Sequence, residues 1–305
     1  MAVIVLLGPT GQVGFELARA LAPLGQLHCL SRADVDFADT PAVKQKVATL
    51  QPDVIVNAAA WTAVDKAETQ SEAAYLLNAA LPEALAHVAQ QQDAWLVHYS
   101  SDYVYPGTGD TPWQESDNTG PLSVYGETKL AGDVAVMQHC PKHLIFRTSW
   151  VYAARGNNFM RTMLKLAQSR EALNVVADQI GAPTPARLIA QVTILALQHV
   201  LLQQVMLTSA DKAIAYAGVY HLAPKGYCSW YDFAGEIFSL ARTRGMTLAL
   251  KPEQFKAITT ADYPTPAKRP ANSRLNVTKL EQRFNLQLPD WQQQLALTFA
   301  ELTAE

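Results

Sequence analysis

The stretch AVIVLLGPTGQVG, residues 2–14, decides the fold of this chain. Residues 2–7 form a short apolar run typical of a buried parallel strand, and glycines follow at positions 8, 11 and 14. Glycines at this spacing allow a tight turn, close backbone approach to a pyrophosphate and close packing of the next helix. The stretch therefore predicts a strand, a phosphate-binding turn and a helix, which together begin a dinucleotide-binding unit.

Outward from this unit, strand-like apolar runs alternate with stretches of helical periodicity. The further runs lie at residues 26–30, 53–57, 95–99 and 144–148. This alternation predicts an α/β fold of the Rossmann type, a doubly wound parallel sheet with helices on both faces. Prolines become frequent after Trp150 and indicate a smaller C-terminal substrate-binding lobe. We expect residues 1–150 to form the NAD(P)-binding domain and 151–305 most of the substrate lobe, with the chain returning to the NAD(P)-binding domain around 185–222.

Composition narrows the class of protein. A chain of 305 residues with 49% hydrophobic side chains can bury a large core. Its formal net charge of -3 is a mixture of signs without a basic run, which argues against nucleic acid as a partner. Cys29, Cys140 and Cys228 form no C-x-x-C pair, so neither a disulfide framework nor a structural zinc site is expected.

The same features favour a cytoplasmic protein. A reducing cytosol suits the cysteines, and the first apolar run has no basic leader and no cleavage site, so we expect no export signal. The longest apolar stretch, residues 188–207, is interrupted by glutamines and a histidine. It predicts a buried core helix rather than a membrane span.

A serine, a tyrosine and a lysine carry the predicted chemistry. Ser101 follows the fourth strand, and Tyr125 and Lys129 are four residues apart, on one face of a helix. A free tyrosine has a pKa near about 10, so the ammonium of Lys129 is expected to stabilise the phenolate. Tyr125 would protonate a carbonyl oxygen while Ser101 hydrogen-bonds it. A Y-x-x-x-K pair alone is common on amphipathic helices, but beside the glycine turn it predicts carbonyl reduction by hydride transfer.

The end of the second strand bears on the choice of cofactor. Leu30 is followed by Ser31 and Arg32, where an NAD site would have an acidic residue. Arg32 is placed to meet a 2′-phosphate, which favours NADPH with NADH as the alternative. A solvated surface arginine is the other interpretation of Arg32.

Longer segments carry a family resemblance. NAAAWTAVDKAE at residues 57–68 and YSSDYVYPG at 99–107 resemble signatures of dTDP-4-dehydrorhamnose reductases, in the extended short-chain dehydrogenase superfamily. RTSWVY at 147–152, GNNF at 156–159, DQIGAPT at 178–184 and RPANS at 269–273 continue the match in the same order. The resemblance implies reduction of dTDP-4-dehydro-L-rhamnose to dTDP-L-rhamnose with NAD(P)H, the last step of dTDP-rhamnose biosynthesis.

The motifs and the resemblance together give the expected site residues. The expected cofactor contacts are Gly8, Thr10, Gly11, Gln12, Val13, Arg32, Asp36, Phe37, Ala58, Ala59, Ala60, Tyr125 and Lys129. The expected substrate contacts are Thr62, Val64, Ser101, Asp102, Tyr103, Tyr125, Trp150 and Arg269. Trp150 is expected against the deoxysugar and Arg269 at the diphosphate, although core packing and surface exposure are the respective alternatives.

Three departures from related proteins are informative. Ser101 stands where family members usually have threonine, and Tyr103 stands where related dehydratases carry a glutamate, which favours reduction over elimination. Some members dimerise around Mg²⁺ held partly by two glutamates. Glu16 is present, but Arg187 occupies the later position and argues against a bridged dimer. His139 and His143 lack ligand spacing, so no metal ligand is expected, while a homodimer is left open.

Two other functions stay open at this point. The regulatory β-subunit of methionine adenosyltransferase resembles the same family and acts as a binding partner, and reductases or epimerases of other nucleotide sugars share its plan. The residues do not select the nucleotide base or the sugar stereochemistry. Retention of Ser101, Tyr125 and Lys129 favours catalysis.

Overall fold

A six-stranded parallel sheet forms the centre of the larger lobe. The computed structural model describes residues 1–206 and 214–303. The strands lie in the order β10-β5-β4-β3-β1-β2, which confirms the predicted fold class. Their bounds are β1 Ala2–Leu7, β2 Gly25–Leu30, β3 Val54–Asn57, β4 Trp95–Ser101, β5 His143–Thr148 and β10 Gly218–His221.

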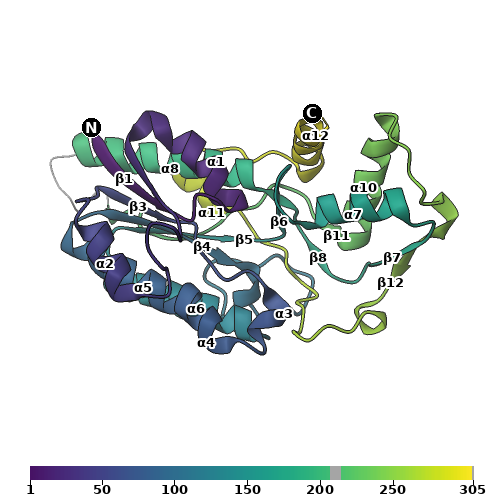
Figure 1. The fold of residues 1–305 in the computed structure, drawn as a ribbon, viewed down its shortest axis with the longest axis horizontal. Helices are drawn as coiled ribbons and strands as arrows, with labels where there is room; N and C mark the ends of the chain where they lie inside the picture. The colour runs from purple at the N-terminus through teal and green to yellow at the C-terminus, as the bar shows by residue number, and fades with distance from the viewer. Residues whose placement is uncertain (207–213, 304–305) are drawn as a thin grey trace.

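Helices cover both faces of this sheet (Figure 1). One face carries α1 (Gln12–Leu21), α8 (Ala186–Met206) and α11 (Thr278–Phe284), and the other carries α2 (Thr40–Ala48), α5 (Leu81–Gln91) and α6 (Val124–His139). Side chains alternate along each strand. On β1, Ile4 and Leu6 therefore enter one apolar cluster while Val5 and Leu7 enter the other. Burial on both faces explains why these strands are apolar at nearly every position.

The smaller lobe has its own apolar core, built around Phe233, Phe238 and Leu295. Figure 1 shows it beside the carboxyl ends of the sheet strands. Its strands pair two by two, as β6 (Val151–Tyr152) with β9 (Thr184–Pro185), β7 (Leu173–Val176) with β12 (Phe255–Ile258), and β8 (Ile180–Gly181) with β11 (Cys228–Ser229). Its helices are α7 (Phe159–Ser169), α10 (Trp230–Thr243) and α12 (Trp291–Leu302).

Short helical elements complete the fold. They are α3 (Val64–Ala67), α4 (Ser71–Tyr75) and the 3₁₀ turns at Ala22–Leu24, Asp102–Val104, Pro252–Gln254 and Thr260–Asp262. A π-helical segment, Leu76–Ala80, joins α4 to α5. Such widened turns within helices are frequent at functional sites.

Helix α8 contains the longest apolar stretch. Its window Ala186–Gln203 is long and apolar enough to cross a membrane by length and composition alone, but half of that window is buried inside the protein. The helix packs on α1, while Leu195 and Leu202 on its outer side are 47% and 60% exposed. It is thus a core helix with one exposed side, and the last residue of the predicted stretch, Leu207, lies outside the described residues.

The strand order locates the expected ligand site. Strand β1 lies between β2 and β3, so the chain winds away from β1 in two directions. In open α/β sheets a crevice forms at the carboxyl ends of the strands where the winding reverses, and ligands bind there. Leu7 and Asn57, the last residues of β1 and β3, are register partners at this edge.

Candidate active site

The glycine turn after β1 brings three elements into close contact. Gly8 has a φ of +78°, and its N–H donates to the carbonyl oxygen of Leu30 at 3.0 Å. A Cβ on Gly8 would lie 2.9 Å from the backbone nitrogen of Ala59, and a Cβ on Gly14 would lie 1.9 Å from the Gly8 oxygen. Gly11 has room, since its nearest neighbour would be 3.6 Å away. The turn is therefore packed on its inner side and accessible at Gly11.

A cavity of about 370 Å³ opens beside this turn. Ligand pockets commonly have volumes of this order and above. Of the expected site residues, the cavity is lined by Gly8, Thr10, Gly11, Arg32, Phe37, Ala58, Ala59, Ala60 and Thr62. It is also lined by Ser31, Trp61, Ala63, Lys66, Gln70 and Leu77, which sequence reasoning missed. The open turn and the cationic side chains of Arg32 and Lys66 fit an anionic dinucleotide.

Five expected cofactor residues do not line the cavity, namely Gln12, Val13, Asp36, Tyr125 and Lys129. Val13 is in the first turn of α1, beside Gln12, whose side-chain oxygen accepts a hydrogen bond from Asn158 Nδ2 at 2.8 Å. Asp36 is exposed, and its carboxylate accepts from the backbone N–H of Ala38 at 3.0 Å. Their contacts with a cofactor stay predictions.

Asn78 joins the loop after β3 to helix α6. No role was predicted for it from the sequence. It is fully buried in the π-helical segment. Its Oδ1 accepts from the Trp61 N–H at 2.9 Å, while its Nδ2 donates to the Trp61 carbonyl oxygen and to Thr128 Oγ1, each at 3.1 Å. One amide side chain thereby holds the cavity wall against the helix that bears Tyr125.

Ser101 and Tyr125 meet at the carboxyl end of β4. Ser101 is the last residue of that strand, and its hydroxyl donates to Asp102 Oδ1 at 2.9 Å and accepts from the Tyr103 N–H at 3.2 Å. Against the larger effect of burial, the Ser101 side chain lowers the pKa of Tyr125, which indicates that the two hydroxyls lie near each other. The ring of Tyr125 contacts Tyr103 edge to face, with centroids 5.4 Å apart. The structure thus places two of the three predicted catalytic side chains near each other.

The start of α6 explains this placement of Tyr125. The side chain of Ser123 caps the helix by accepting from the Gly126 N–H at 3.3 Å, which puts Tyr125 in the first turn. A Cβ on Gly126 would lie only 2.3 Å from the carbonyl oxygen of Tyr103. Glycine at this position lets the helix approach the loop after β4 closely enough for Tyr125 to reach Ser101.

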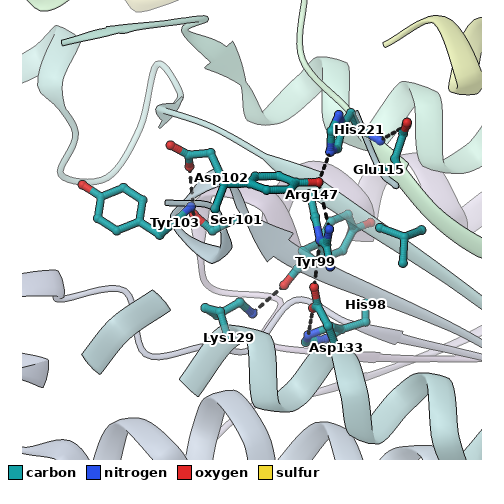
Figure 2. A network of polar contacts seen from close by, with 12 residues as sticks. His98, Tyr99, Ser101, Asp102, Tyr103, Glu115, Lys129, Asp133, Arg147 and His221 are labelled. Carbon is teal, nitrogen blue, oxygen red and sulfur yellow. Dashed lines mark hydrogen bonds and ion pairs between the residues drawn. The ribbon is translucent and has the colours of Figure 1, made fainter. Parts of the chain in front are cut away.

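Lys129 lies one turn further along α6 and is buried. Its Nζ donates to the carbonyl oxygen of Tyr99 at 2.5 Å (Figure 2). Burial lowers the pKa of Lys129 to about 8, and the charge of Asp133 opposes this effect. Burial raises the pKa of Tyr125 above its ordinary value, so the phenol keeps its proton at neutral pH. That state suits an acid which protonates a carbonyl oxygen, while the expected effect of Lys129 on Tyr125 stays a prediction.

A buried polar network lies behind Lys129 (Figure 2). Asp133 is fully buried on α6 and accepts from Arg147 Nε on β5 at 3.0 Å. Arg147 Nη1 donates to the hydroxyl of Tyr105 at 2.8 Å, and that hydroxyl lies 2.6 Å from His221 Nε2 on β10. Burial lowers the pKa of His221 to about 3, so its imidazole is neutral. The Asp133 carboxylate therefore interacts with two cationic side chains, those of Arg147 and Lys129.

Asp102 and Arg269 lie on the substrate side. Burial raises the pKa of Asp102 to about 6, although its hydrogen bonds, including the one from Ser101, oppose the shift. Arg269 Nη1 donates to the Tyr103 hydroxyl at 3.2 Å, and its Nη2 bonds Asp65 Oδ2 at 2.7 Å. Arg269 therefore reaches the site, but it is already paired with a carboxylate that sequence reasoning missed. Val64, the residue before Asp65, is the first of α3.

Trp150 lies in the smaller lobe with an unusual backbone. Its φ is +49°, and its ring stacks on Trp230 with centroids 3.6 Å apart and planes 13° apart. Trp230 was not predicted from the sequence as a partner of Trp150. The local signal there, a capping pattern of Ser229 and Asp232, indicates only the start of a helix. Contact between Trp150 and a sugar stays a prediction.

Arg187 is bound to two acidic side chains of its own chain. Its Nε lies 3.2 Å from Glu16 Oε2 on α1, and its Nη2 lies 2.6 Å from Glu301 Oε1 on α12. The carboxylate that some family members offer to Mg²⁺ is thus engaged by a guanidinium. The ion pairs also connect the larger lobe to the C-terminal helix.

A phenol that keeps its proton, on the same edge of the sheet as a turn accessible to a dinucleotide, is suited to deliver a proton while a hydride reaches a carbonyl carbon. By fold and site, the molecule is an oxidoreductase of the short-chain dehydrogenase type with a Rossmann sheet.

Comparison with known proteins narrows the class. The family described as RmlD substrate binding domain matches residues 1–304. The dTDP-4-dehydrorhamnose reductase of Shigella flexneri is 54% identical over 293 residues, which cover 95% of this chain and 94% of that protein. The chain therefore belongs to the RmlD family, and the resemblance predicted from the sequence is confirmed.

Solved structures of similar proteins agree with this family assignment. The crystal structure of a dTDP-4-dehydrorhamnose reductase from Clostridium acetobutylicum is similar with a TM-score of 0.85 and 35% identity, covering 98% of this chain and 99% of that one. The dTDP-4-dehydrorhamnose reductase of Bacillus anthracis, solved in complex with NADP, has a TM-score of 0.83 and 32% identity, with 98% and 99% coverage.

Proposed function

We propose that this chain reduces the 4-keto group of dTDP-4-dehydro-L-rhamnose to give dTDP-L-rhamnose, with NADPH as the preferred cofactor and NADH as the alternative. The observation that carries the proposal is the proximity of the Ser101 and Tyr125 hydroxyls at the carboxyl end of β4, on the same edge of the sheet as the glycine turn after β1. Family membership over nearly the whole chain supports the same substrate.

The cavity beside the glycine turn is the proposed cofactor site. NADPH, when bound, supplies the hydride. The N–H groups of the turn and of the first turn of α1 would hold its diphosphate, and Arg32 its 2′-phosphate. The loop Ala58–Ala60 and the side chain of Lys129 would hold the nicotinamide end. A cavity of about 370 Å³ lined by eight of the predicted cofactor residues supports this assignment.

The residues of the chain then transfer one proton to the substrate and stabilise the charges that result. Tyr125 donates its hydroxyl proton to the substrate carbonyl oxygen as that oxygen becomes an alkoxide. Ser101 has a single proton, which it donates to Asp102, so it must turn toward the substrate to hydrogen-bond the same oxygen. The positive charge of Lys129 stabilises the phenolate that Tyr125 leaves behind.

The substrate would lie between the two lobes. We propose contacts from Thr62, Val64, Asp102, Tyr103, Trp150 and Arg269, as the family resemblance implies. Arg269 would have to share its guanidinium between Asp65 and a diphosphate, which its five N–H donors allow. On this proposal, residues 1–150 and the returning segment at about 185–222 bind the cofactor, and most of residues 151–305 bind the sugar nucleotide.

Location and assembly belong to the proposal as well. We propose a cytoplasmic enzyme whose partner is a dTDP-sugar, with neither nucleic acid nor a membrane surface as a ligand. A homodimer is compatible with the proposal, and its interface would not need Mg²⁺ at Glu16.

The test is oxidation of NADPH, followed by its absorbance, with dTDP-, UDP- and GDP-linked 4-keto sugars supplied in turn. We expect turnover with dTDP-4-dehydro-L-rhamnose and formation of dTDP-L-rhamnose, identified by chromatography. Faster turnover of another nucleotide sugar would replace the proposed substrate. Absence of turnover with every sugar, together with co-purification of a methionine adenosyltransferase, would favour the regulatory-subunit function instead.

A further inference from the structure

Away from the proposed active site, three side chains with metal-binding atoms meet between α5 and α6. Glu83 and His87 are four residues apart on α5, and His139 is the last residue of α6. His139 Nε2 lies 3.9 Å from Glu83 Oε1, and the rings of His87 and His139 have centroids 4.2 Å apart with planes tilted by 36°. One ligand atom from each residue lies within 4.8 Å of the other two.

We propose that Glu83, His87 and His139 form a site for a divalent transition metal of the Zn²⁺, Co²⁺ or Ni²⁺ type. Imidazole nitrogens with one carboxylate are donors that these ions prefer, whereas Mg²⁺ and Ca²⁺ prefer oxygen ligands alone. Three protein ligands leave a fourth position for water. The site is separate from the position of Glu16, where some family members bind Mg²⁺. It does not depend on the proposed reductase activity.

The side chains can close on an ion without moving the helices. Metal–ligand distances of about 2.0–2.2 Å require the three ligand atoms to lie roughly 3–4 Å apart, a little closer than the spacing in the structure. The side chains of His139 and Glu83 are 34% and 46% exposed, so their side-chain torsions are free to make this adjustment. The i, i+4 spacing on α5 already puts Glu83 and His87 on one face.

One neighbouring charge opposes a cation. Burial, His139 and Lys44 on α2 lower the pKa of His87, while Glu83 raises it. Because the ammonium of Lys44 acts on the ring that would bind the metal, it also repels the ion itself. Removal of that ammonium should therefore strengthen metal binding, and this effect can be tested with a Lys44 variant.

The position in the fold separates this site from the chemistry. His139 follows Tyr125 by fourteen residues on the same helix, which is about 20 Å along its axis. A bound ion would join the C-terminal end of α6 to α5, two helices that cover one face of the sheet. Because such an ion binds the folded chain, it should raise the melting temperature while leaving the hydride-transfer site unaltered.

The test uses the full chain without a histidine tag, stripped with EDTA and then titrated. Zn²⁺ binding is followed by calorimetry and by melting temperature, and Co²⁺ binding by its visible absorption. We expect one ion per chain, affinity at least about tenfold weaker in His87→Gln and in His139→Gln, and tighter binding in Lys44→Gln. Reduction of a keto sugar should be the same with and without the ion.

A matched control addresses the exposed thiol of Cys29, which lies next to His28 on β2 and is itself a potential metal ligand. Cys29→Ser should leave the stoichiometry and the affinity unchanged. The proposal is overturned if Zn²⁺ does not bind, if either histidine variant binds as tightly as the unaltered chain, or if Cys29→Ser abolishes binding. Each variant is compared at equal helix content, so that a loss of folding is not taken for a loss of ligands.

Discussion

Replacement of Tyr125 by phenylalanine removes one oxygen from the proposed site and leaves the ring in place. The edge-to-face contact with Tyr103 should persist, because it involves ring atoms alone. Ser101 still donates to Asp102 at 2.9 Å, so its hydroxyl keeps its acceptor. The loss in folding stability should therefore be no larger than that of one hydrogen bond, about 0.5–1.5 kcal/mol.

The effect on turnover should be much larger. Without its hydroxyl the enzyme has no proton donor at the position that Tyr125 occupies, and a positioned general acid is worth about 10²–10⁴-fold in rate. This factor corresponds to roughly 3–5 kcal/mol of activation free energy. Cofactor affinity should change little, since the cavity beside the glycine turn is lined by other residues.

The assay is steady-state NADPH oxidation with the keto sugar, together with cofactor titration by fluorescence. Tyr99→Phe is the matched control, because it removes a hydroxyl that lies 2.8 Å from Thr193 Oγ1 and has no role in the proposed chemistry. It should retain most of the activity. A Tyr125→Phe enzyme within a few-fold of the unaltered enzyme would refute the role of Tyr125 as the acid.

Four further outcomes are expected. Activity should fall as the pH rises through about 8, because Lys129 then loses its charge. Asp133→Asn should move this fall to lower pH, because the charge of Asp133 raises the pKa of Lys129. A fall at the same pH in this variant would contradict that effect of Asp133. Arg32→Ala should reduce the ratio of kcat/KM for NADPH to that for NADH by about tenfold or more, and an unchanged ratio would exclude a contact with the 2′-phosphate. Activity should not need Mg²⁺, since Arg187 stands where a metal-binding carboxylate would be required; loss on chelation that Mg²⁺ restores would disprove this. Burial raises the pKa of Asp102 from 3.8 to about 6, so the folded state binds the extra proton and stability should fall as the pH rises through that window. Asp102→Asn should therefore be more stable than the unaltered chain above pH 6, by at most about 3 kcal/mol, and should lose the advantage near pH 4; equal differences in urea unfolding at both pH values would argue against it.

Local patterns were sufficient for most of the sheet. The run at residues 2–7 and the glycines after it predict β1 and its turn, because apolar burial and turn geometry are set by neighbouring residues. Strand β10, Gly218–His221, was not foreseen as a strand. Its four residues carry no alternation that distinguishes them from a loop, and their place is set by pairing with β5.

Side chains that reach the site from elsewhere were harder to predict. Lys66 and Gln70 line the cavity because the loop after β3 folds back over it, which no local pattern specifies. Asn78 faces Trp61 from a π-helical turn, and the sequence around it has ordinary helical periodicity. No metal ligand was expected from the sequence, because only the packing of α5 on α6 brings a ligand atom of His139 beside those of Glu83 and His87.

The stacked pair of Trp150 and Trp230 also gives the smaller lobe an optical signature. Indole rings held with centroids 3.6 Å apart couple their electronic transitions, so the pair should contribute a near-ultraviolet circular dichroism signal of its own. Both rings belong to the smaller lobe, whereas the buried Trp95 on β4 contributes its own near-ultraviolet signal from the sheet. The difference between the spectra of the unaltered protein and of Trp230→Phe therefore follows the packing of the smaller lobe, while cofactor fluorescence follows the larger one.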